Sequence, residues 1–291
     1  MEQPVIIGIG ELLWDILPDG KQMGGAPANF AFHASQMGVC SAVVSAIGDD
    51  VLGDKLIASI ESLKLNYKIS RLPYPTGVVN VSIAAGGIPE YEIVEGVAWD
   101  YMPVVEDGDW RAKLQAVCFG SLAQRNEVSR NTIQSFIKSL SDEVLKVFDV
   151  NVRQHFYDKE LIHDSLSVSN IFKLNDDELQ LMCKLWGFSG SNEKVCTHLL
   201  EKYDLELVVL TCGEKGSYLI SRNEISFQDT PDINVVDTVG AGDSFTAAVV
   251  VGLLEGKDMV SIHKHAVELA AYVCKHAGAV PDHTNLNSHH S

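Results

Sequence analysis

Apolar residues along the chain gather in short runs that alternate with longer segments of helical spacing. The runs are rich in β-branched residues, which favours buried strands over residues 5–9, 42–47, 117–119, 144–150, 171–174 and 207–210. Between them, apolar positions recur every three or four residues, which predicts helices over 28–37, 52–63, 128–140, 177–186 and 193–203. This alternation predicts an α/β fold, with a doubly wound, mainly parallel sheet flanked by helices.

Two stretches, 11–24 and 73–101, break the alternation, because glycine and proline rather than helices join their strand-like runs. In the second stretch, residues 78–84 and 91–97 flank Gly86, Gly87 and Pro89, which predicts a hairpin. We expect the two stretches to form a small β-sheet lid. The main α/β domain then comprises 1–10, 25–72 and 102–291.

Charge limits the partners of the 291-residue chain, whose formal net charge is −17. Such a surface repels nucleic acid and anionic membranes, so neither is an expected partner. An acidic protein that binds a polyphosphate needs local compensation from a cation or from oriented backbone N–H groups.

Cysteine usage and the chain ends carry little further signal. The six cysteines are scattered without metal-ligand spacing and are expected to be buried thiols. The N-terminus lacks a basic segment followed by a long apolar stretch, and no apolar run reaches the length of a membrane span, so a cytoplasmic protein is expected. Residues 282–291 are expected to form a disordered tail.

The segment DTVGAGD at 237–243 stands directly before an apolar helical run. Its glycines allow close approach of a ligand, and the first N–H groups of a helix can bind phosphate oxygens, so Gly240, Ala241 and Gly242 are candidates for an anion hole. Asp243 beside that hole would repel phosphate unless its charge serves a purpose, such as accepting the proton of an attacking hydroxyl. The alternative is a carboxylate that only caps the helix.

Other nucleotide-binding motifs are absent or weak. The P-loop pattern does not occur in the sequence, and Gly8-Ile9-Gly10 after the first strand has Leu13 where a dinucleotide fingerprint has its third glycine. A dehydrogenase is therefore disfavoured.

Two motifs at opposite ends of the chain, GGAPAN at 24–29 and DTVGAGD at 237–243, together resemble the signatures of the ribokinase-like (PfkB) carbohydrate kinases. The segments GELLWD at 10–15, GSLAQR at 120–125 and DVNVR at 149–153 are most similar to those of fructokinases. The resemblance covers nearly the whole chain, and it implies an ATP-dependent sugar kinase with a β-sheet lid.

The resemblance places Asp15, Gly25 and Asn29 in the sugar site, where carboxylate and amide groups suit hydroxyls and glycine admits close approach. Arg153 is a further candidate for the substrate, and Arg125 is a weaker one. The alternatives are a turn residue for Asp15, a helix-start cap for Asn29 and surface ion pairs for the arginines.

For the nucleotide, NDDE at 175–178 resembles the family's NxxE motif, which implies that Asn175 contacts phosphate and that Glu178 organises Mg²⁺ through water. A capping sequence is the other interpretation, and both can hold. TCGEKG at 211–216 resembles the TxGxxG nucleotide loop through Thr211, Gly213 and Gly216, with a plain hairpin as the alternative.

The resemblance also implies a monovalent cation, commonly K⁺, held by Asp237 and the carbonyl of Val239, with further ligands near Gly278. Related kinases pair through the lid sheet, and the apolar residues Val79, Val81 and Ile83 would need covering, so a homodimer through the lid is expected.

The motifs together predict transfer of the γ-phosphate of ATP to a hydroxyl of a small sugar, with fructose first. Kinases for ribose, a nucleoside or 2-keto-3-deoxygluconate are alternatives, because the shared motifs do not fix the sugar. A non-catalytic sugar sensor on the same fold is the competing class.

Overall fold

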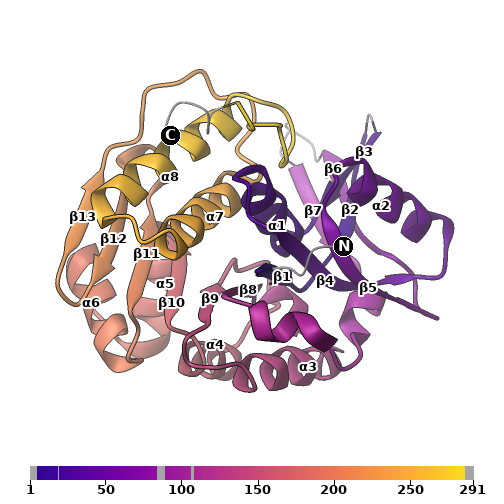
Figure 1. Ribbon diagram of the computed structural model, residues 1–291, viewed down its shortest axis with the longest axis horizontal. Helices are drawn as coiled ribbons and strands as arrows, with labels where there is room; N and C mark the ends of the chain where they lie inside the picture. The colour runs from indigo at the N-terminus through magenta and orange to yellow at the C-terminus, as the bar shows by residue number, and fades with distance from the viewer. Residues whose placement is uncertain (1–4, 19, 84–88, 106–107, 286–291) are drawn as a thin grey trace.

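The computed structural model describes residues 5–18, 20–83, 89–105 and 108–285 and has one large sheet at its centre (Figure 1). The strand order in this nine-stranded sheet is β13-β12-β11-β10-β9-β8-β1-β4-β5, and all neighbours are parallel except at β12 and β13. The strands are β1 (Ile6–Ile9), β4 (Ser41–Gly48), β5 (Asn66–Leu72), β8 (Ala116–Gly120), β9 (Leu145–Asp149), β10 (Ile171–Asn175), β11 (Leu207–Thr211), β12 (Ser217–Ser221) and β13 (Ile225–Gln228). The predicted fold class is confirmed.

Helices cover both faces of the large sheet (Figure 1). They are α1 (Ala26–Gln36), α2 (Val51–Ser62), α3 (Glu127–Lys138), α4 (Lys159–Ser167), α5 (Asp176–Trp186), α6 (Asn192–Lys202), α7 (Ala241–Leu254) and α8 (Met259–Cys274). Successive strand residues such as Ile6 and Ile7 are both buried but belong to different hydrophobic clusters, because their side chains point to opposite faces. Helices α1, α2, α7 and α8 pack on one face, and α3 to α6 pack on the other.

Helix α7 lies between α1 and α8 and is buried on all sides from Ser244 to Gly252. A helix that is apolar all round has to lie inside a protein. Its N-terminus, which carries the DTVGAGD motif, is therefore fixed by packing along nearly the whole helix.

A second sheet has the strand order β3-β2-β6-β7. Its strands are β2 (Leu13–Leu17), β3 (Gly20–Gly24), β6 (Gly77–Ile83) and β7 (Pro89–Ile93), and they lie within the two stretches expected to form the lid. The predicted hairpin is present as the antiparallel pair β6–β7, but its second strand begins at Pro89 and ends at Ile93 rather than 97. Gly86 and Gly87 lie outside the described residues.

One face of this sheet already packs within the chain. Val79 is 6% exposed, and Val81 packs against the main hydrophobic core. The side chain of Ile83 lies outside the described residues. An uncovered apolar face on Val79 and Val81 is therefore no longer a reason to expect a dimer.

Two expectations, about the C-terminal segment and about the cysteines, need correction. Residues 282–285 are not a disordered tail, because His283 is 1% exposed and packs against His33; residues 286–291 lie outside the described range. Cysteine burial is also incomplete, since Cys40, Cys183 and Cys274 are only partly buried. Within the described ranges, no helix is long and apolar enough to cross a membrane.

Candidate active site

The candidate residues gather where the parallel strands end. Gly10 follows β1, Asp149 ends β9, Asn175 ends β10 and Thr211 ends β11. In α/β sheets of this kind, ligands bind outside the carboxyl ends of the strands. The lid strands β2 and β3 join the same edge through residues 10–13 and the start of α1 at residues 24–26.

The N-termini of α1 and α7 differ from those of the other described α-helices. Side chains cap the first backbone N–H groups of six helices: Asp50 for α2, Asn126 for α3, Asp158 for α4, Asn175 for α5, Ser191 for α6 and Asp258 for α8. Helices α1 and α7 instead begin at Gly25 and Gly240, and neither has a side-chain cap. In α1, Pro27 has no N–H group and Ala28 N donates to the Gly25 carbonyl, so the start of α7 is the better candidate for binding an anion.

Asn29 and Asp243 meet between these two helix starts. Asn29 Nδ2 donates a 2.8 Å hydrogen bond to Asp243 Oδ2, although 214 residues separate them in sequence. Neither residue caps its helix, because Asn29 lies in the second turn of α1 and Asp243 accepts no capping bond. The capping alternative is therefore wrong for both.

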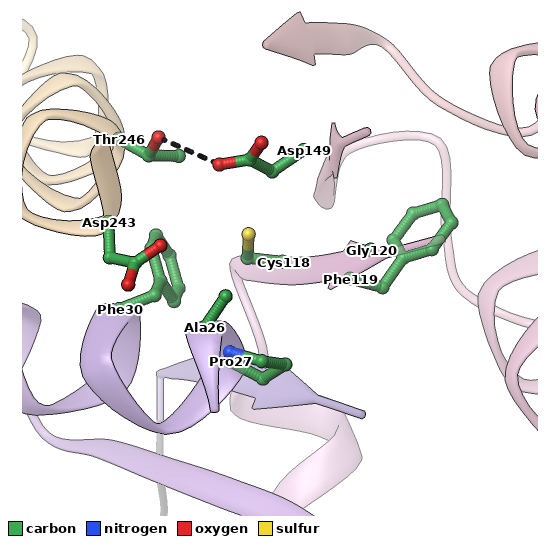
Figure 2. A pocket seen from close by; sticks show the side chains of 9 residues that line it. All are labelled: Ala26, Pro27, Phe30, Cys118, Phe119, Gly120, Asp149, Asp243 and Thr246. Carbon is green, nitrogen blue, oxygen red and sulfur yellow. Dashed lines mark hydrogen bonds between the residues drawn. The ribbon is translucent and has the colours of Figure 1, made fainter. Parts of the chain in front are cut away.

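The surroundings of Asp243 favour its protonated form. Loss of water around the carboxyl group and the nearby charge of Asp149 raise the pKa of Asp243 to about 6, although Asn29, Lys173 and Arg153 act in the opposite direction. A carboxylate with a pKa this close to neutrality is suited to general-base catalysis. Figure 2 shows Asp243 facing Asp149 and Cys118 across a cavity of about 10 Å³, roughly the volume that one water molecule needs.

Asp15 lies on strand β2 and not in a turn, so the turn alternative is wrong. In the lid sheet it stands opposite Gln22 on β3 and Val79 on β6. Its carboxylate covers Gly24, since a Cβ atom at Gly24 would come within 2.4 Å of Asp15 Oδ2. Burial raises the pKa of Asp15, and the positive charge of Arg153 lowers it.

Gly25 connects the lid to α1 with a φ of 121°, a value that glycine adopts far more readily than other residues. A Cβ atom there would lie 2.4 Å from the carbonyl oxygen of Glu11. Both the backbone conformation and the close approach therefore require glycine at the start of α1.

Arg153 and Glu11 add charge to the same region. Arg153 is exposed, follows β9, and interacts electrostatically with Glu11, Asp15 and Asp243. Sequence reasoning missed Glu11, which is 3% exposed and has no hydrogen-bond partner for Oε2 among the described residues. Burial raises the pKa of Glu11 to about 7. A carboxylate between Gly10 and the apolar Leu12, two residues after a buried strand, was the available signal.

The anion-hole segment is packed against the C-terminal part of the chain. Gly240 has a φ of 79°, and a Cβ atom there would come within 2.3 Å of the Ala279 carbonyl oxygen. Asp237 fixes the segment from the other side, because it accepts hydrogen bonds from Val239 N and Gly278 N, each at 3.0 Å. Ala241 N donates a long bond of 3.3 Å to the Thr238 carbonyl, which a phosphate oxygen would have to replace.

The predicted nucleotide residues occupy neighbouring strand ends. Asn175 and Thr211 are direct partners in the pairing of β10 with β11. The hairpin interpretation of the following loop is correct as well, since β11 and β12 are antiparallel neighbours. Gly213 has a φ of 56°, and Gly216 has a φ of 101°, which glycine adopts readily. Asn175 and Thr211 therefore lie side by side at the carboxyl ends of β10 and β11.

Glu178 and Asn175 form a capping box, as one interpretation of NDDE predicted. Asn175 Oδ1 accepts from Glu178 N at 2.9 Å, and Glu178 Oε2 accepts from Asn175 N at 2.8 Å. Glu178 Oε1 accepts from Val152 N at 2.8 Å. A carboxylate oxygen can accept more than one bond, so this group fits Mg²⁺ held through water. Within the described residues no three His, Cys, Asp or Glu side chains converge on a metal position.

Arg125 makes its hydrogen bonds to residues that are not among the candidate site residues. Its Nε and Nη2 atoms donate to Asp100 at 2.7 and 2.9 Å, and Nη2 donates to the Val94 carbonyl at 2.6 Å. Its guanidinium lies 4.0 Å from the Trp99 ring centroid. The ion pair is buried, so the interpretation of Arg125 as part of a surface ion pair is wrong, and its contact with substrate stays a prediction.

Sequence reasoning did not single out two further charged residues that act electrostatically on Asp243. Asp149 and Lys173 form an ion pair with an N–O distance of 3.1 Å, and their side chains are 6% and 7% exposed. The signal for Lys173 was a basic residue inside the apolar run 171–174.

Comparison with known proteins agrees with the fold and the motifs. The family model "pfkB family carbohydrate kinase" matches residues 19–285. An uncharacterized sugar kinase, PH1459, from Pyrococcus horikoshii is 30% identical over 298 residues, which cover 94% of this chain and 91% of the relative. Its crystal structure in complex with ATP superimposes with a TM-score of 0.81 and covers 94% of each chain at 29% identity.

Relatives with named sugars are more distant. The fructokinase of Escherichia coli is 24% identical over 263 residues, 84% of this chain and 83% of that protein. The structure of 2-dehydro-3-deoxygluconokinase from Thermotoga maritima has a TM-score of 0.83 at 19% identity, covers 99% of this chain and 98% of that chain, and so shows the fold alone.

The sheet topology and the meeting of Asn29 with Asp243 define an α/β protein with a candidate site at the carboxyl ends of its parallel strands. The chain belongs to the pfkB family of carbohydrate kinases.

Proposed function

We propose that the protein is an ATP-dependent kinase that transfers the γ-phosphate to a hydroxyl of a small sugar, with fructose as the first candidate, and that Asp243 is the general base. The hydrogen bond between Asn29 and Asp243 carries the proposal, because it joins the predicted sugar site to the start of α7. The carboxylate then stands where a sugar hydroxyl and a phosphate could meet.

In this proposal Asp15, Gly25, Asn29 and Arg153 bind the sugar hydroxyls. Asp15 accepts from hydroxyls, and Asn29 both donates and accepts through its amide. The small β-sheet lid, which carries Asp15, would cover the sugar and exclude water, and so limit hydrolysis of ATP.

Asp243 takes the proton of the attacking hydroxyl. The backbone N–H groups at Gly240, Ala241 and Gly242 stabilise the negative charge that develops on the transferred phosphoryl group. The raised pKa of Asp243, about 6, still leaves the carboxylate mostly ionised at neutral pH. It is a stronger base there than an ordinary aspartate, because its proton affinity is higher.

ATP would bind over Asn175, Thr211, Gly213 and Gly216 at the ends of β10 and β11. The ATP complex of the Pyrococcus relative supports ATP as the nucleotide. Glu178 would hold Mg²⁺ through water, and that ion would offset charge on the phosphates. Asp237 and the Val239 carbonyl would hold a monovalent cation such as K⁺ and so fix the anion-hole loop. The proposed location is the cytoplasm, and the homodimer through the lid stays a prediction.

Fructose is favoured by the similarity to fructokinases at 24–27% identity. Kinases for ribose, a nucleoside or 2-keto-3-deoxygluconate remain alternatives, and the similarity to the 2-dehydro-3-deoxygluconokinase fold supports keeping the last of them. A non-catalytic sensor is disfavoured because Asp243 and its partner Asn29 are both in place.

The test is ADP release with Mg·ATP and K⁺ over fructose, ribose, glucose, 2-keto-3-deoxygluconate and nucleosides, for wild type and Asp243→Asn. We expect turnover on fructose that falls by roughly 10² to 10⁴ in the variant, the usual contribution of a general base. Turnover on another sugar would correct the substrate and keep the mechanism. Sugar binding without turnover on any member of the panel would overturn the kinase and favour the sensor.

A further inference from the structure

Lys173 is a charged residue in the middle of a buried strand. It stands on β10 between apolar neighbours, is 6% exposed, and has its ammonium 3.1 Å from both carboxylate oxygens of Asp149. Removing two charges from water is expensive, and an apolar pair of similar volume is often at least as stable. Stability alone therefore gives little reason for an ion pair at this position.

The ammonium of Lys173 lies against the second glycine of the DTVGAGD motif. A Cβ atom at Gly242 would come within 3.1 Å of Lys173 Nζ and 3.7 Å of Cε. Gly242 is the second residue of α7. Unlike Gly240, it has no left-handed φ that would require glycine. The missing side chain leaves room for the Lys173 ammonium.

Asp149 connects the same ion pair to the first turn of α7. Thr246 Oγ1 donates to the Gly242 carbonyl at 2.9 Å and lies 3.5 Å from Asp149 Oδ2 (Figure 2). The ion pair of β9 and β10 therefore supports the turn that carries both the anion-hole glycine and Asp243.

The charges around Asp243 come from several elements. They are Asp149 at the end of β9, Lys173 on β10, Arg153 in the loop after β9, Glu11 after β1 and, beside Lys173, Glu178 on α5; the titratable thiol of Cys118 on β8 also faces Asp243. The carboxylates outnumber the cations. Of the two cations, Arg153 is exposed, whereas Lys173 is fixed by its ion pair.

We propose that Lys173 is a positioning residue for the proposed base, which acts by holding a buried positive charge under Gly242 and beside Asp243. The ammonium compensates the negative charge of Asp149, so that the Asp243 carboxyl group can stay ionised beside Asp149. The proposal rests on the assignment of Asp243 as general base.

The direction of each charge effect makes the proposal testable. Lys173 lowers the pKa of Asp243, and Asp149 raises it. Lys173→Met should therefore move the pH at which kcat/KM falls to half its plateau upward by about one unit, a shift typical of losing one nearby charge. Asp149→Asn should move it downward, and Asp149→Asn with Lys173→Met should return it close to the wild-type value. A purely structural ion pair would lower stability in these variants without this pattern of opposite shifts.

Gly242→Ala provides a second route if Lys173→Met fails to fold. The added methyl group favours the helix but pushes the ammonium away, so the midpoint should again move upward, by less than in Lys173→Met. Lys146→Met is the matched control, because Lys146 is a 12% exposed lysine on β9 whose partner Asp142 is fully exposed. That variant should keep the wild-type midpoint.

A titration without turnover separates this proposal from the proposed function. The Asp243 carboxyl can be followed by ¹³C NMR, with its signal assigned by its loss in Asp243→Asn. If no sugar is phosphorylated but the titration of Asp243 still moves upward in Lys173→Met, the charge relationship holds and the kinase assignment fails. An unchanged Asp243 midpoint in folded Lys173→Met and Gly242→Ala would overturn the role of Lys173.

Discussion

Asn29 Nδ2 donates to Asp243 Oδ2 at 2.8 Å and so connects helix α1 to helix α7. This hydrogen bond favours the ionised carboxylate, against burial and the charge of Asp149, which together raise the pKa of Asp243 to about 6. A base is active when deprotonated. Activity should therefore rise as the pH increases through about 6 and reach a plateau above about 7.

Asn29→Ala should move that acid limb to higher pH, because the variant loses the donor that stabilises the carboxylate. Sugar KM should increase too if Asn29 contacts hydroxyls, with a loss of about 1 kcal/mol per neutral hydrogen bond, or roughly fivefold. The measurement is kcat/KM from pH 5 to 9 for both proteins. Gln36→Ala, at the far end of the same helix, is the control, and an acid limb that stays in place in Asn29→Ala would contradict the role given to the bond.

Arg125 is expected to matter for stability rather than for substrate binding. Its bidentate pair with Asp100 is buried, and the guanidinium also binds the carbonyl of Val94, just after lid strand β7. Arg125→Met leaves Asp100 as a buried unpaired charge, which should lower the unfolding free energy by about 3 to 5 kcal/mol. Asp100→Asn combined with Arg125→Met should recover part of the loss.

Urea unfolding of the two variants measures this difference, and KM for the sugar serves as the second readout. We expect KM to stay at the wild-type value in whichever variant remains folded. An Arg125→Met protein of normal stability but with a raised sugar KM would instead place Arg125 in the substrate site.

Sequence patterns predicted the parts of the fold that are buried on both faces. Strands such as β1 and β11 are nearly continuous apolar runs because helices cover both sides of the sheet. Strand β5 was missed because it is the edge strand, and the sequence NYKISRL alternates polar and apolar residues. Helix α4 was missed because it has only nine residues, too few for a clear helical period.

The motifs identified Asp243 and Asn29, but the charges that surround the base could not be read from them. Asp149 ends β9, Lys173 lies in the middle of β10 and Glu11 follows β1, and only the order of strands brings them together. Alternatives based on local capping were wrong for Asn29 and Asp243 because tertiary packing, not the local chain, supplies their partners. They held for Asn175, whose partner is three residues away.

Removal of K⁺ should reduce the rate by loosening the anion-hole loop. Asp237 bridges Val239 N and Gly278 N, so a cation on its carboxylate would act on the loop and on the C-terminal segment together. We expect about a tenfold loss of kcat when tetramethylammonium replaces K⁺, less than the effect of deleting an anion-hole donor. Asp237→Asn should have this reduced rate in either salt, and equal rates for wild type in both salts would exclude the cation site.

His33 links α1 to the segment that covers Gly240. It is fully buried; its Nε2 contacts the Ala279 carbonyl at 2.9 Å, and its Nδ1 contacts His283 Nε2 at 2.9 Å. A carbonyl only accepts, so His33 Nε2 is the donor, His33 Nδ1 accepts and His283 Nε2 donates. His33→Leu would leave the carbonyl and the His283 N–H unpaired, which should cost about 1 to 3 kcal/mol for each group. His163→Leu, an exposed histidine on α4, is the control and should change little.

The pH dependence of stability provides a specific sign for this histidine pair. Burial lowers the pKa of His33 to about 3 and that of His283 to about 4, whereas both titrate near 6.5 in the unfolded chain. As the pH falls below about 6.5, the unfolded state binds protons that the folded state cannot take up. The contribution of the neutral histidines to the unfolding free energy is therefore complete above about pH 6.5 and is lost as the pH falls toward 4.

Wild type should lose unfolding free energy over this range more steeply than His33→Leu, as measured by urea unfolding at a series of pH values. Equal slopes for the two proteins would mean that His33 is not held neutral by the fold, because all other titrating groups are common to both.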